Sequence, residues 1–247
     1  MLKIANWNLE RVTPGQARAK RIDVAMSEVV ADIWVLTETH KDIVPMPFYS
    51  IMSEADPESK PGERWSAILS RYPLEPLGDF VSDKIRCVAG KLDHPQIGLV
   101  IVYALVLPWI GSEWRGVPSH DGAAFASALD IYQSEWERLQ HAYPNALHIV
   151  AGDFNQSLVD FHYYGSKKNR LKLELALEES NLQAITSGPG DPVARDSYPH
   201  ACIDHICISK KAVSNIISTM RFPDADKPDK RLSDHFGVVV ELSYKSF

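Results

Sequence analysis

The letters SDHFGV, residues 233–238, place Asp234 and His235 directly before the apolar run FGVVVEL of residues 236–242. Valine and phenylalanine are typical of strands, and such a strand needs no Asp-His pair at its start in order to fold. Neighbouring residues of a strand point to opposite faces, so both polar side chains can serve one site only where the backbone bends. We therefore expect a loop–strand junction here, which carries either a capping pair or part of a polar site.

Short apolar runs of the same kind recur along the chain. Most are rich in Val, Ile and aromatic residues, which predicts strands. The predicted strands cover residues 2–9, 32–39, 48–53, 66–70, 85–92, 98–107, 146–154, 182–186, 201–209, 213–221 and 236–242. Helical spacing of apolar residues predicts helices over residues 16–30, 121–142 and 168–180.

This order of elements limits the fold class. Strands and helices alternate irregularly, which disfavours a fully parallel doubly wound sheet and a barrel of strand–helix units. About eleven strands also exceed what one twisted open sheet usually holds. We predict the α/β class, with two packed mixed or antiparallel sheets flanked by helices. The 247 residues show no repeat or linker, so we expect one domain over residues 1–247.

Composition and net charge limit which cellular environment and which binding partners we expect. The net charge of −6 argues mildly against broad, non-specific binding to nucleic acid. The chain has three cysteines, and Cys202 and Cys207 would lie about 16 Å apart in an extended segment, beyond disulfide reach. The N-terminus lacks the pattern of a signal peptide, and the apolar stretch 98–110 is too short to span a bilayer. We expect a reduced cytoplasmic protein without membrane contact, and no obligate protein partner is evident.

Polar residues interrupt two strands near the N-terminus. In IANWNLE, Asn6 and Asn8 share one face of the predicted strand, and a buried asparagine must find hydrogen-bond partners. In IWVLTETH, Glu38 lies at the exit of the strand, where an unpaired carboxylate is costly unless it is solvated or binds an ion. Taken alone, Asn8 is more typical of a turn, and Glu38 more typical of a solvated strand end, than of a functional site.

Two later strands carry the same kind of interruption. In HIVAGDFNQ, Asp153 and Asn155 are two residues apart and can reach one cavity, while Gly152 permits a turn or a close backbone approach. In CIDHICIS, Asp204 stands among apolar residues and needs a partner, for which a histidine is suited. Oxygen ligands without cysteine are what Mg2+ or Mn2+ prefers, and a histidine with a carboxylate is equipment for acid–base chemistry.

The motifs NWN, TET, GDFN, IDHI and SDHFGV, in this order from Asn6 to Val238, resemble those of the endonuclease/exonuclease/phosphatase superfamily. This superfamily has the DNase I-like fold and includes the apurinic endonucleases. The resemblance implies two packed sheets flanked by helices and metal-dependent hydrolysis of phosphodiester bonds. It also implies that Glu38 binds the metal ion directly, with Asn8 and Asp234 in the same metal site.

The resemblance further implies the catalytic roles. Asp153 is expected to orient or deprotonate the attacking water, and Asn155 is expected to contact the phosphate. His235 would contact the scissile phosphate, while Asp204 would fix the tautomer of His235 and stabilise its charged form. The charge of the phosphodiester repels hydroxide, which is why such a site needs a metal ion and positioned polar groups.

One position departs from the pattern of the apurinic endonucleases, which carry a tyrosine near the end of the strand that here reads VIVYALVLPW. Our register places Val106 at that point, with Tyr103 three residues earlier. The phosphate contact of that tyrosine is therefore not carried over to this chain, the role of the region stays open, and neither residue is included in the site.

The substrate is predicted less sharply than the reaction. The segment NQSLVDFHYYGSKKNR mixes aromatic residues with cations, which can stack bases and hold phosphates, so a nuclease acting on DNA or RNA is the first hypothesis. Its predicted substrate-binding residues are His162, Tyr163, Lys167 and Lys168. A tyrosine-capped helix entrance explains the same segment equally well.

Two other functions stay open. The acidic net charge favours a phosphatase or phosphodiesterase acting on a small phosphorylated metabolite or, less readily, a lipid head group. A binding module that has lost the chemistry is the third hypothesis. The sequence leaves open the choice among DNA, RNA and a small phosphoester, endo- or exo-cleavage, the number and identity of the metal ions and the oligomeric state.

Overall fold

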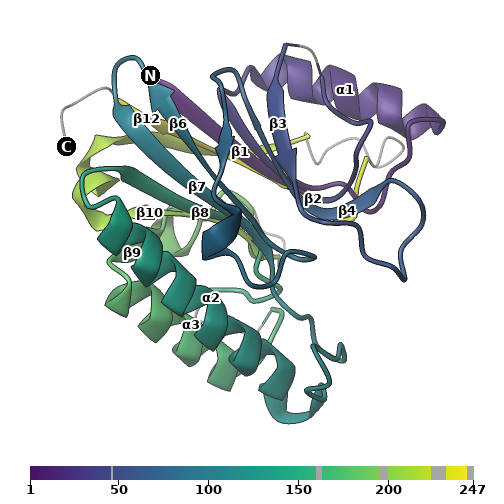
Figure 1. The fold of residues 1–247 in the computed structure, drawn as a ribbon, viewed down its shortest axis with the longest axis vertical. Helices are drawn as coiled ribbons and strands as arrows, with labels where there is room; N and C mark the ends of the chain where they lie inside the picture. Colours follow the sequence, from purple (N-terminus) through teal and green to yellow (C-terminus); the bar gives the residue numbers. More distant parts are fainter. Residues whose placement is uncertain (46, 160–162, 195–199, 224–231, 244–247) are drawn as a thin grey trace.

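Two β-sheets form the centre of the computed structural model, which describes residues 1–45, 47–159, 163–194, 200–223 and 232–243 (Figure 1). The first sheet has the order β11-β12-β1-β2-β4-β3 and the second the order β5-β6-β7-β8-β10-β9. The strands of the first sheet are β1 (Leu2–Asn8), β2 (Ile33–His40), β3 (Tyr49–Met52), β4 (Glu63–Ser70), β11 (Ile216–Phe222) and β12 (Gly237–Leu242). Those of the second are β5 (Glu75–Pro76), β6 (Val88–His94), β7 (Gly98–Val106), β8 (Leu147–Asp153), β9 (Leu182–Ala184) and β10 (Asp204–Ser209).

Three α-helices flank the sheets: α1 (Ala17–Val29), α2 (Ala123–Ala142) and α3 (Lys167–Glu179). Helix α1 covers the outer side of the first sheet, while α2 and α3 cover the outer side of the second (Figure 1). Each sheet is mixed, because β1 runs parallel to β2 and β7 parallel to β8, whereas the other paired strands are antiparallel. The predicted fold class is confirmed.

Side-chain alternation divides the core into three layers. Ile4 and Ile33 point into the core between the two sheets, where they meet apolar residues of β7 and β8. Trp7 and Trp34, one residue out of phase with them, pack under α1. A third cluster fills the space between the second sheet and helices α2 and α3. Strand periodicity therefore correctly placed Asn6 and Asn8 on one face of β1, opposite to Trp7.

The predicted strand over residues 213–221 is wrong at its start. The short 3-10 helix η4 (Lys210–Asn215) occupies that part, and β11 begins only at Ile216. A short apolar run does not distinguish a tight helical turn from a strand, because both bury the same residues. Ala212 is fully buried within η4, which satisfies the apolar pattern without an extended backbone.

Asn6 connects the two sheets at the centre of the molecule. Its side chain is fully buried, and its Nδ2 donates to the carbonyl of Gly152 at 2.8 Å and to that of His205 at 3.4 Å. The expectation that a buried asparagine finds partners is met for Nδ2 by backbone groups of β8 and β10, while Oδ1 has no hydrogen-bond partner among the described residues. The two hydrogen bonds of the Asn6 side chain thus fix the first sheet against the second beside the end of β8.

Gly152 permits a close approach of β7 and β8 immediately before Asp153. Its φ is 145°, and a Cβ at this position would lie 1.9 Å from the carbonyl oxygen of Leu105. No side chain fits there unless the two parallel strands separate. The glycine therefore sets the distance between β7 and the residue that follows it in β8.

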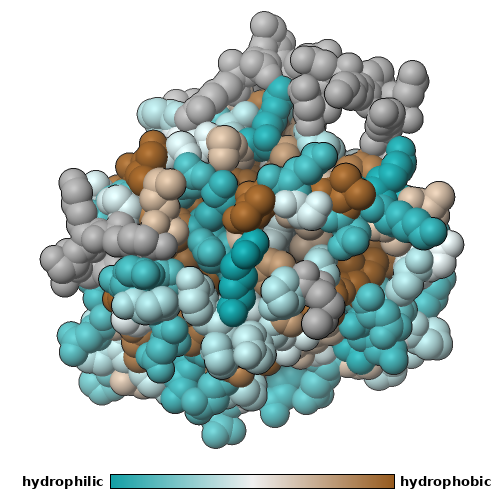
Figure 2. All heavy atoms as spheres, turned by 90° about the horizontal axis from the view of Figure 1, so that it is seen from above, coloured by the Kyte–Doolittle hydropathy of each residue, from teal (hydrophilic) through white to brown (hydrophobic). Residues whose placement is uncertain are grey.

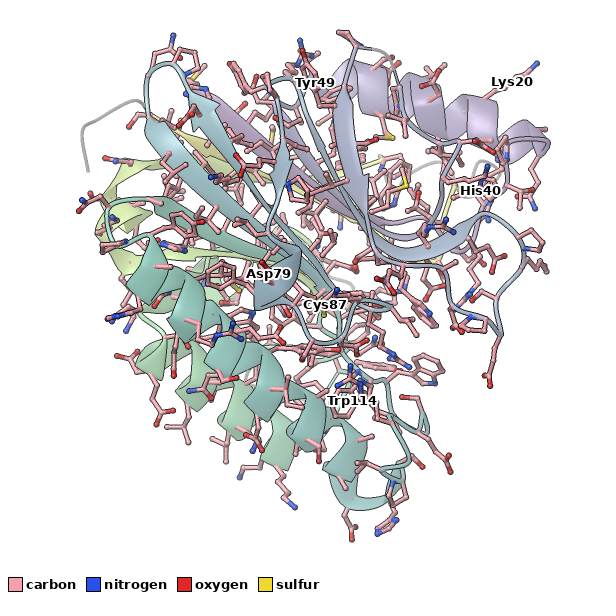
Figure 3. The ribbon with its side chains drawn as sticks, in the orientation of Figure 1. Lys20, His40, Tyr49, Asp79, Cys87 and Trp114 are labelled. Carbon is pink, nitrogen blue, oxygen red and sulfur yellow. The ribbon has the colours of Figure 1, made fainter. Side chains whose placement is uncertain are left out.

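The three cysteines lie in the interior of the molecule. Cys87, Cys202 and Cys207 are all free and buried. Cys87 and Trp114 lie between the second sheet and α2 (Figure 3). On the face shown in Figure 2, exposed hydrophobic residues are separated from one another by hydrophilic residues. Within the described part of the chain, no helix combines the length and hydrophobicity that crossing a bilayer requires.

A pair of glycine variants tests the close approach of β7 and β8. Gly98, with φ 85°, has open space where a Cβ would stand, so Gly98→Ala should cost about 1–3 kcal/mol through backbone strain alone. Gly152→Ala adds the collision with Leu105 and should lower the free energy of unfolding by clearly more. Urea denaturation of both variants measures the difference, and equal losses would contradict the role given to Gly152.

Candidate active site

Polar side chains from both sheets converge where β1, β2 and β8 end. Asn8 is the last residue of β1, and its Nδ2 donates to Oδ2 of Asp153, the last residue of β8, at 3.1 Å. Asp204 begins β10 and lies directly opposite Asp153 in the antiparallel pairing. His235 precedes β12, which pairs with β1. The fold thereby gathers residues that lie more than 200 positions apart in the chain.

Asp204 and His235 form a short contact, with 2.6 Å between Oδ2 of Asp204 and Nδ1 of His235. The backbone bends at residues 234–235, as the sequence predicts. Ser233 holds this bend, because its hydroxyl donates to the carbonyl of Asn8 at 2.6 Å and accepts from the backbone N–H of His235 at 3.1 Å. The indole N–H of Trp7 donates to the carbonyl of His235 at 3.2 Å. The imidazole is therefore fixed through its backbone as well as its side chain.

The charges around His235 keep its imidazole protonated. Burial by itself lowers the pKa of this group, but the negative charges of Asp204, Asp153 and Asp234, with the hydrogen bond to Asp204, raise the pKa to about 10. At neutral pH the side chain is an imidazolium whose Nδ1–H donates to Asp204. Its Nε2 lies 3.9 Å from Oδ1 of Asp234.

Two N–H donors hold the carboxylate of Asp153. Besides Asn8 on Oδ2, the backbone N–H of Asn155 donates to Oδ1 at 2.9 Å. Asn155 has φ 49°, and its own Nδ2 donates to the carbonyl of Leu107 at 2.9 Å. A turn at Asn155, and not an extended segment, therefore brings Asp153 and Asn155 into the same site. Left-handed backbone is well tolerated by asparagine, which suits this position.

The environment of Asp153 disfavours its ionised form. Burial and the neighbouring charges of Asp204 and Glu38 raise the pKa of Asp153 to about 7, although His235 and the N–H of Asn155 act in the opposite direction. An acid buried near other acids behaves in this way because each negative charge disfavours the next.

Glu38 interrupts the regular backbone of β2 two residues before that strand ends at His40. Strict alternation would place Glu38 on the face of Trp34 and Leu36, but its φ of 45° breaks the alternation. Its carboxylate lies 3.3 Å from Nε of Arg11, and its charge acts on Asp153. Glu38 therefore lies toward the polar cluster.

The cluster fits a divalent cation. Asp153, Asp204 and His235 each offer a ligand atom, and these atoms lie within 4.8 Å of one another. Nδ1 of His235 is already paired, whereas the buried Oδ1 of Asp204 has no hydrogen-bond partner among the described residues. With Glu38 nearby, the excess of carboxylate oxygens is the donor set that hard cations prefer, and a cation would offset the charge that raises the pKa of Asp153. Neither Glu38 nor Asp234 belongs to this compact group of ligand atoms.

Two of the predicted substrate-binding residues are related to this cluster, since Tyr163 lies near Asp204 and Lys168 shares a cavity with Asn155. The phenol of Tyr163 contacts Nδ1 of His200 at 2.9 Å, and burial together with the charge of Asp204 raises its pKa. Lys167 is the first residue of α3, and Lys168 lines a cavity that also contains Asn155. His162 lies outside the described residues.

Val106 and Tyr103 are not part of the predicted site. Val106 bears no polar group, and Tyr103 is buried away from the reaction centre. Val106 lies opposite Asp153 in the pairing of β7 with β8 and is buried. Tyr103 is in the core under α2, where its hydroxyl donates to Oε2 of Glu135 at 2.5 Å. Neither residue supplies a phenol to the site.

Sequence reasoning missed the contribution of Arg11, whereas the resemblance already named His235, and not His205, as the partner of Asp204. Arg11 pairs with Glu38 and, at 3.1 Å, with Oε2 of Glu63, and no motif marks it. His205, adjacent to Asp204 in the chain, instead contacts the carbonyl of Gln156 at 3.0 Å and has a pKa lowered by burial. The neighbour in sequence is structural, and the distant histidine is the partner of Asp204.

Comparisons with known proteins agree with this geometry. Residues 5–235 match the model of the Endonuclease/Exonuclease/phosphatase family, so the chain belongs to that family of divalent-metal-dependent phosphoester hydrolases. No curated protein sequence matches it. The fold is shared with an AP endonuclease from Archaeoglobus fulgidus, which is 15% identical with a TM-score of 0.68, over 98% of this chain and 99% of that one.

Two further solved structures have the same fold. A 3'-5' exonuclease from Neisseria meningitidis is 18% identical with a TM-score of 0.64, over 98% of this chain and 99% of that one. A mannosyl-6-phosphatase from Bacteroides thetaiotaomicron is 17% identical with a TM-score of 0.65, over 98% of this chain and 100% of that one. The family covers both nucleases and phosphatases.

The protonation of His235 can be measured directly. In metal-free protein, NMR titration should show a His235 pKa near 10, and Asp204→Asn should move it well down toward the usual 6.5. His205, whose pKa is lowered by burial, serves as an internal control in the same spectra. A His235 pKa that is unchanged in Asp204→Asn would contradict the assigned pair.

The raised pKa of His235 also predicts that the stability of the protein depends on pH. Because the folded pKa of His235 lies above its usual value of 6.5, its contribution is complete below about pH 6.5 and is lost as pH rises through about 10. The free energy of unfolding of the metal-free protein should therefore fall over this window, and less steeply in Asp204→Asn. Urea denaturation at several pH values measures both slopes, and parallel slopes would oppose the assignment.

Proposed function

We propose that the protein is a Mg2+- or Mn2+-dependent phosphodiesterase that cleaves DNA or RNA. The observation that carries the proposal is the 2.6 Å pair of Asp204 and His235 beside the buried carboxylate of Asp153. These three groups combine a fixed positive charge with a carboxylate of near-neutral pKa in one place. Hydrolysis of an anionic ester needs both, one to stabilise the phosphate and one to activate water.

The metal ion would be held by Glu38, with Asn8 and Asp234 around it. When bound, it supplies positive charge that stabilises the phosphate and the leaving oxygen. Asn8 connects this part of the site to the rest, because its amide also donates to Asp153. The ion pair of Arg11 with Glu38 fixes the direction of that carboxylate.

Asp153 takes the role of general base. A base works best when its pKa is close to the working pH, and burial beside Asp204 raises the pKa of Asp153 to about 7. The N–H donors of Asn8 and Asn155 orient the carboxylate so that one direction remains for a water molecule. Asn155 retains a second Nδ2–H for the phosphate, since an amide has two such donors and Leu107 takes one.

His235 takes the role of phosphate contact. Its Nδ1–H is used by Asp204, so its Nε2–H is the donor that faces a phosphate oxygen. The positive charge is retained through the reaction because the pKa of His235 is about 10. Asp204 acts on the substrate only through His235 and is a positioning residue.

Tyr163, Lys167 and Lys168 support a nucleic acid as substrate. An aromatic ring and cations beside a phosphoester site are suited to stacking bases and holding the backbone. The AP endonuclease and the exonuclease that share this fold are nucleases by name. A small phosphoester is the second candidate, favoured by the net charge of −6 and by the likeness to a mannosyl-6-phosphatase.

A substrate panel decides between these candidates. Single- and double-stranded DNA, RNA, abasic DNA, nucleotides, mannose 6-phosphate and phosphoinositides are incubated at low salt with Mg2+, with Mn2+ or with EDTA. We expect cleavage of a polynucleotide that EDTA abolishes. Phosphate release from a small ester without polynucleotide cleavage would replace the nuclease proposal by the phosphatase.

The catalytic residues are tested on whichever substrate the panel selects. His235→Ala and Asp153→Asn should each lower kcat by roughly 100- to 10,000-fold, as loss of a positioned acid–base group does. His141→Ala, at the exposed C-terminal end of α2, is the matched control and should leave kcat unchanged. Full activity of either site variant would refute the mechanism.

Metal binding can be tested without turnover. Saturation with Mg2+ or Mn2+ at about 100 times the dissociation constant should stabilise the protein by roughly 2.7 kcal/mol, because the ion binds only the folded state. Glu38→Gln should remove most of the corresponding rise in melting temperature. A similar rise in the variant and the parent would exclude Glu38 as a ligand.

A further inference from the structure

The chain makes a left-handed turn directly after Asn8, the last residue of β1. Glu10 and Arg11 have φ values of 49° and 50°. The backbone N–H of Arg11 donates to the carbonyl of Glu38 at 2.8 Å, and Glu38 itself has φ 45°. Residues other than glycine rarely adopt this conformation, which persists only where surrounding contacts hold it. The shape of this turn is therefore imposed by its partners.

The turn holds two residues of the proposed metal site. The backbone N–H of Glu10 donates to Oδ1 of Asn8 at 2.9 Å, while Nδ2 of Asn8 donates to Asp153. An amide oxygen accepts two hydrogen bonds, so Oδ1 keeps one lone pair for a cation. On the other side of the turn, Nε of Arg11 lies 3.3 Å from the carboxylate of Glu38. The directions of Asn8 and Glu38 thus depend on the shape of the turn.

Arg18, in the first turn of α1, contacts this turn from outside the site. Its Nη2 donates to the carbonyl of Glu10 at 2.8 Å, and its Nη1 lies 2.5 Å from Oε2 of the same residue. The Nη1 also donates to the carbonyl of Leu232 at 3.1 Å. Leu232 directly precedes the bend that carries Asp234 and His235. One guanidinium therefore connects the loop after β1 to the loop before β12.

These contacts are more than a surface ion pair. The side chain of Arg18 is 21% exposed, and two of its hydrogen bonds go to backbone carbonyls of separate loops. A cation in the first turn of a helix opposes the helix dipole, and the first turn of α1 contains no acidic residue that offsets this. The position of Arg18 is thus unfavourable for the helix and is compensated by the two loops.

We propose that Arg18 is a positioning residue of the metal site, which fixes the loop before β12 against the turn after β1. The first of these segments carries Asp234 and His235, and the second holds Asn8. Arg18 acts only through the backbone and side chain of Glu10 and the carbonyl of the residue before Ser233, and it takes no part in the chemistry. The inference rests on the proposed function and adds the element that keeps the two halves of the site together.

The direction of the change in metal affinity separates positioning from electrostatics. Arg18 is a cation near a site for a cation, so its charge alone opposes metal binding, and its removal would strengthen binding. Loss of positioning acts in the opposite direction, because removal of a group that orients metal ligands weakens metal affinity by roughly 10- to 100-fold. Weaker binding without the Arg18 charge therefore supports positioning.

Calorimetric titration with Mn2+ tests the inference without turnover. Arg18→Gln should bind Mn2+ roughly tenfold more weakly than the parent. Lys20→Gln is the matched control, because Lys20 is exposed on the same helix (Figure 3), and its Mn2+ affinity should equal that of the parent. Parent-like or tighter binding by Arg18→Gln would overturn the positioning role, and so would equal weakening in both variants.

Arg18→Lys decides the matter if Arg18→Gln does not fold. Lysine keeps the charge but lacks the planar fork that reaches both carbonyls, so Mn2+ affinity should again fall, by less than in Arg18→Gln. Circular dichroism of the metal-free protein establishes that the variant is folded. Parent-like affinity in folded Arg18→Lys, with Arg18→Gln unfolded, would reduce Arg18 to a structural residue.

Kinetics on the substrate that the panel selects give a second readout. With Mn2+ saturating, Arg18→Gln should lower kcat about tenfold and leave KM nearly unchanged, because a displaced His235 stabilises the transition state less well. A purely structural role would leave kcat of the folded, metal-saturated variant at the parent value. A raised KM with parent-like kcat would indicate direct substrate contact and overturn the assignment.

Glu38→Gln distinguishes failure of this inference from failure of the proposed function. If Glu38→Gln abolishes Mn2+ binding while Arg18→Gln binds like the parent, the metal site stands and only the positioning role is lost. If the parent itself binds no Mn2+, there is no metal site to position, and both proposals are overturned.

Discussion

Asp153 and Asp204 face each other across adjacent antiparallel strands, and both are almost fully buried. Burying an ionised carboxylate costs several kcal/mol, and a second one beside it adds repulsion. The fold tolerates the pair because His235 brings a positive charge to Asp204 while Asn8 and Asn155 donate to Asp153. This requirement explains why the loop before β12, a strand of the first sheet, reaches the strand ends of the second.

The packing between the sheets also keeps the partners of these buried carboxylates in place. Asn6 joins β1 to β8 and β10 through backbone carbonyls, and Gly152 lets β7 approach β8 immediately before Asp153. These contacts leave little freedom for the strand ends that carry the polar groups. The site is therefore held by regular strands on one side and by tight turns at Glu38 and Asn155 on the other.

The buried Oδ1 of Asp204 has no hydrogen-bond partner among the described residues, and it lies in the cluster with Asp153 and His235 that fits a divalent cation. Natural structures accept such local costs at functional sites. The unpartnered oxygen is therefore consistent with a metal ion near the reaction centre.

The sequence by itself determined the two-sheet α/β class, the shared face of Asn6 and Asn8 in β1, and the family, because side-chain alternation and short motifs are local properties of the chain. It also named Asp153, Asp204 and His235, since polar residues at the ends of apolar strands are visible without a structure. The pairing of Asp204 with His235, 31 residues away, was implied by the resemblance alone, and only the tertiary structure shows why the adjacent His205 does not take that place. The tertiary structure also decided that Glu38 and Asn155 leave the strand alternation. These facts depend on how distant strands pack and on where the backbone turns left-handed, which no local pattern specifies.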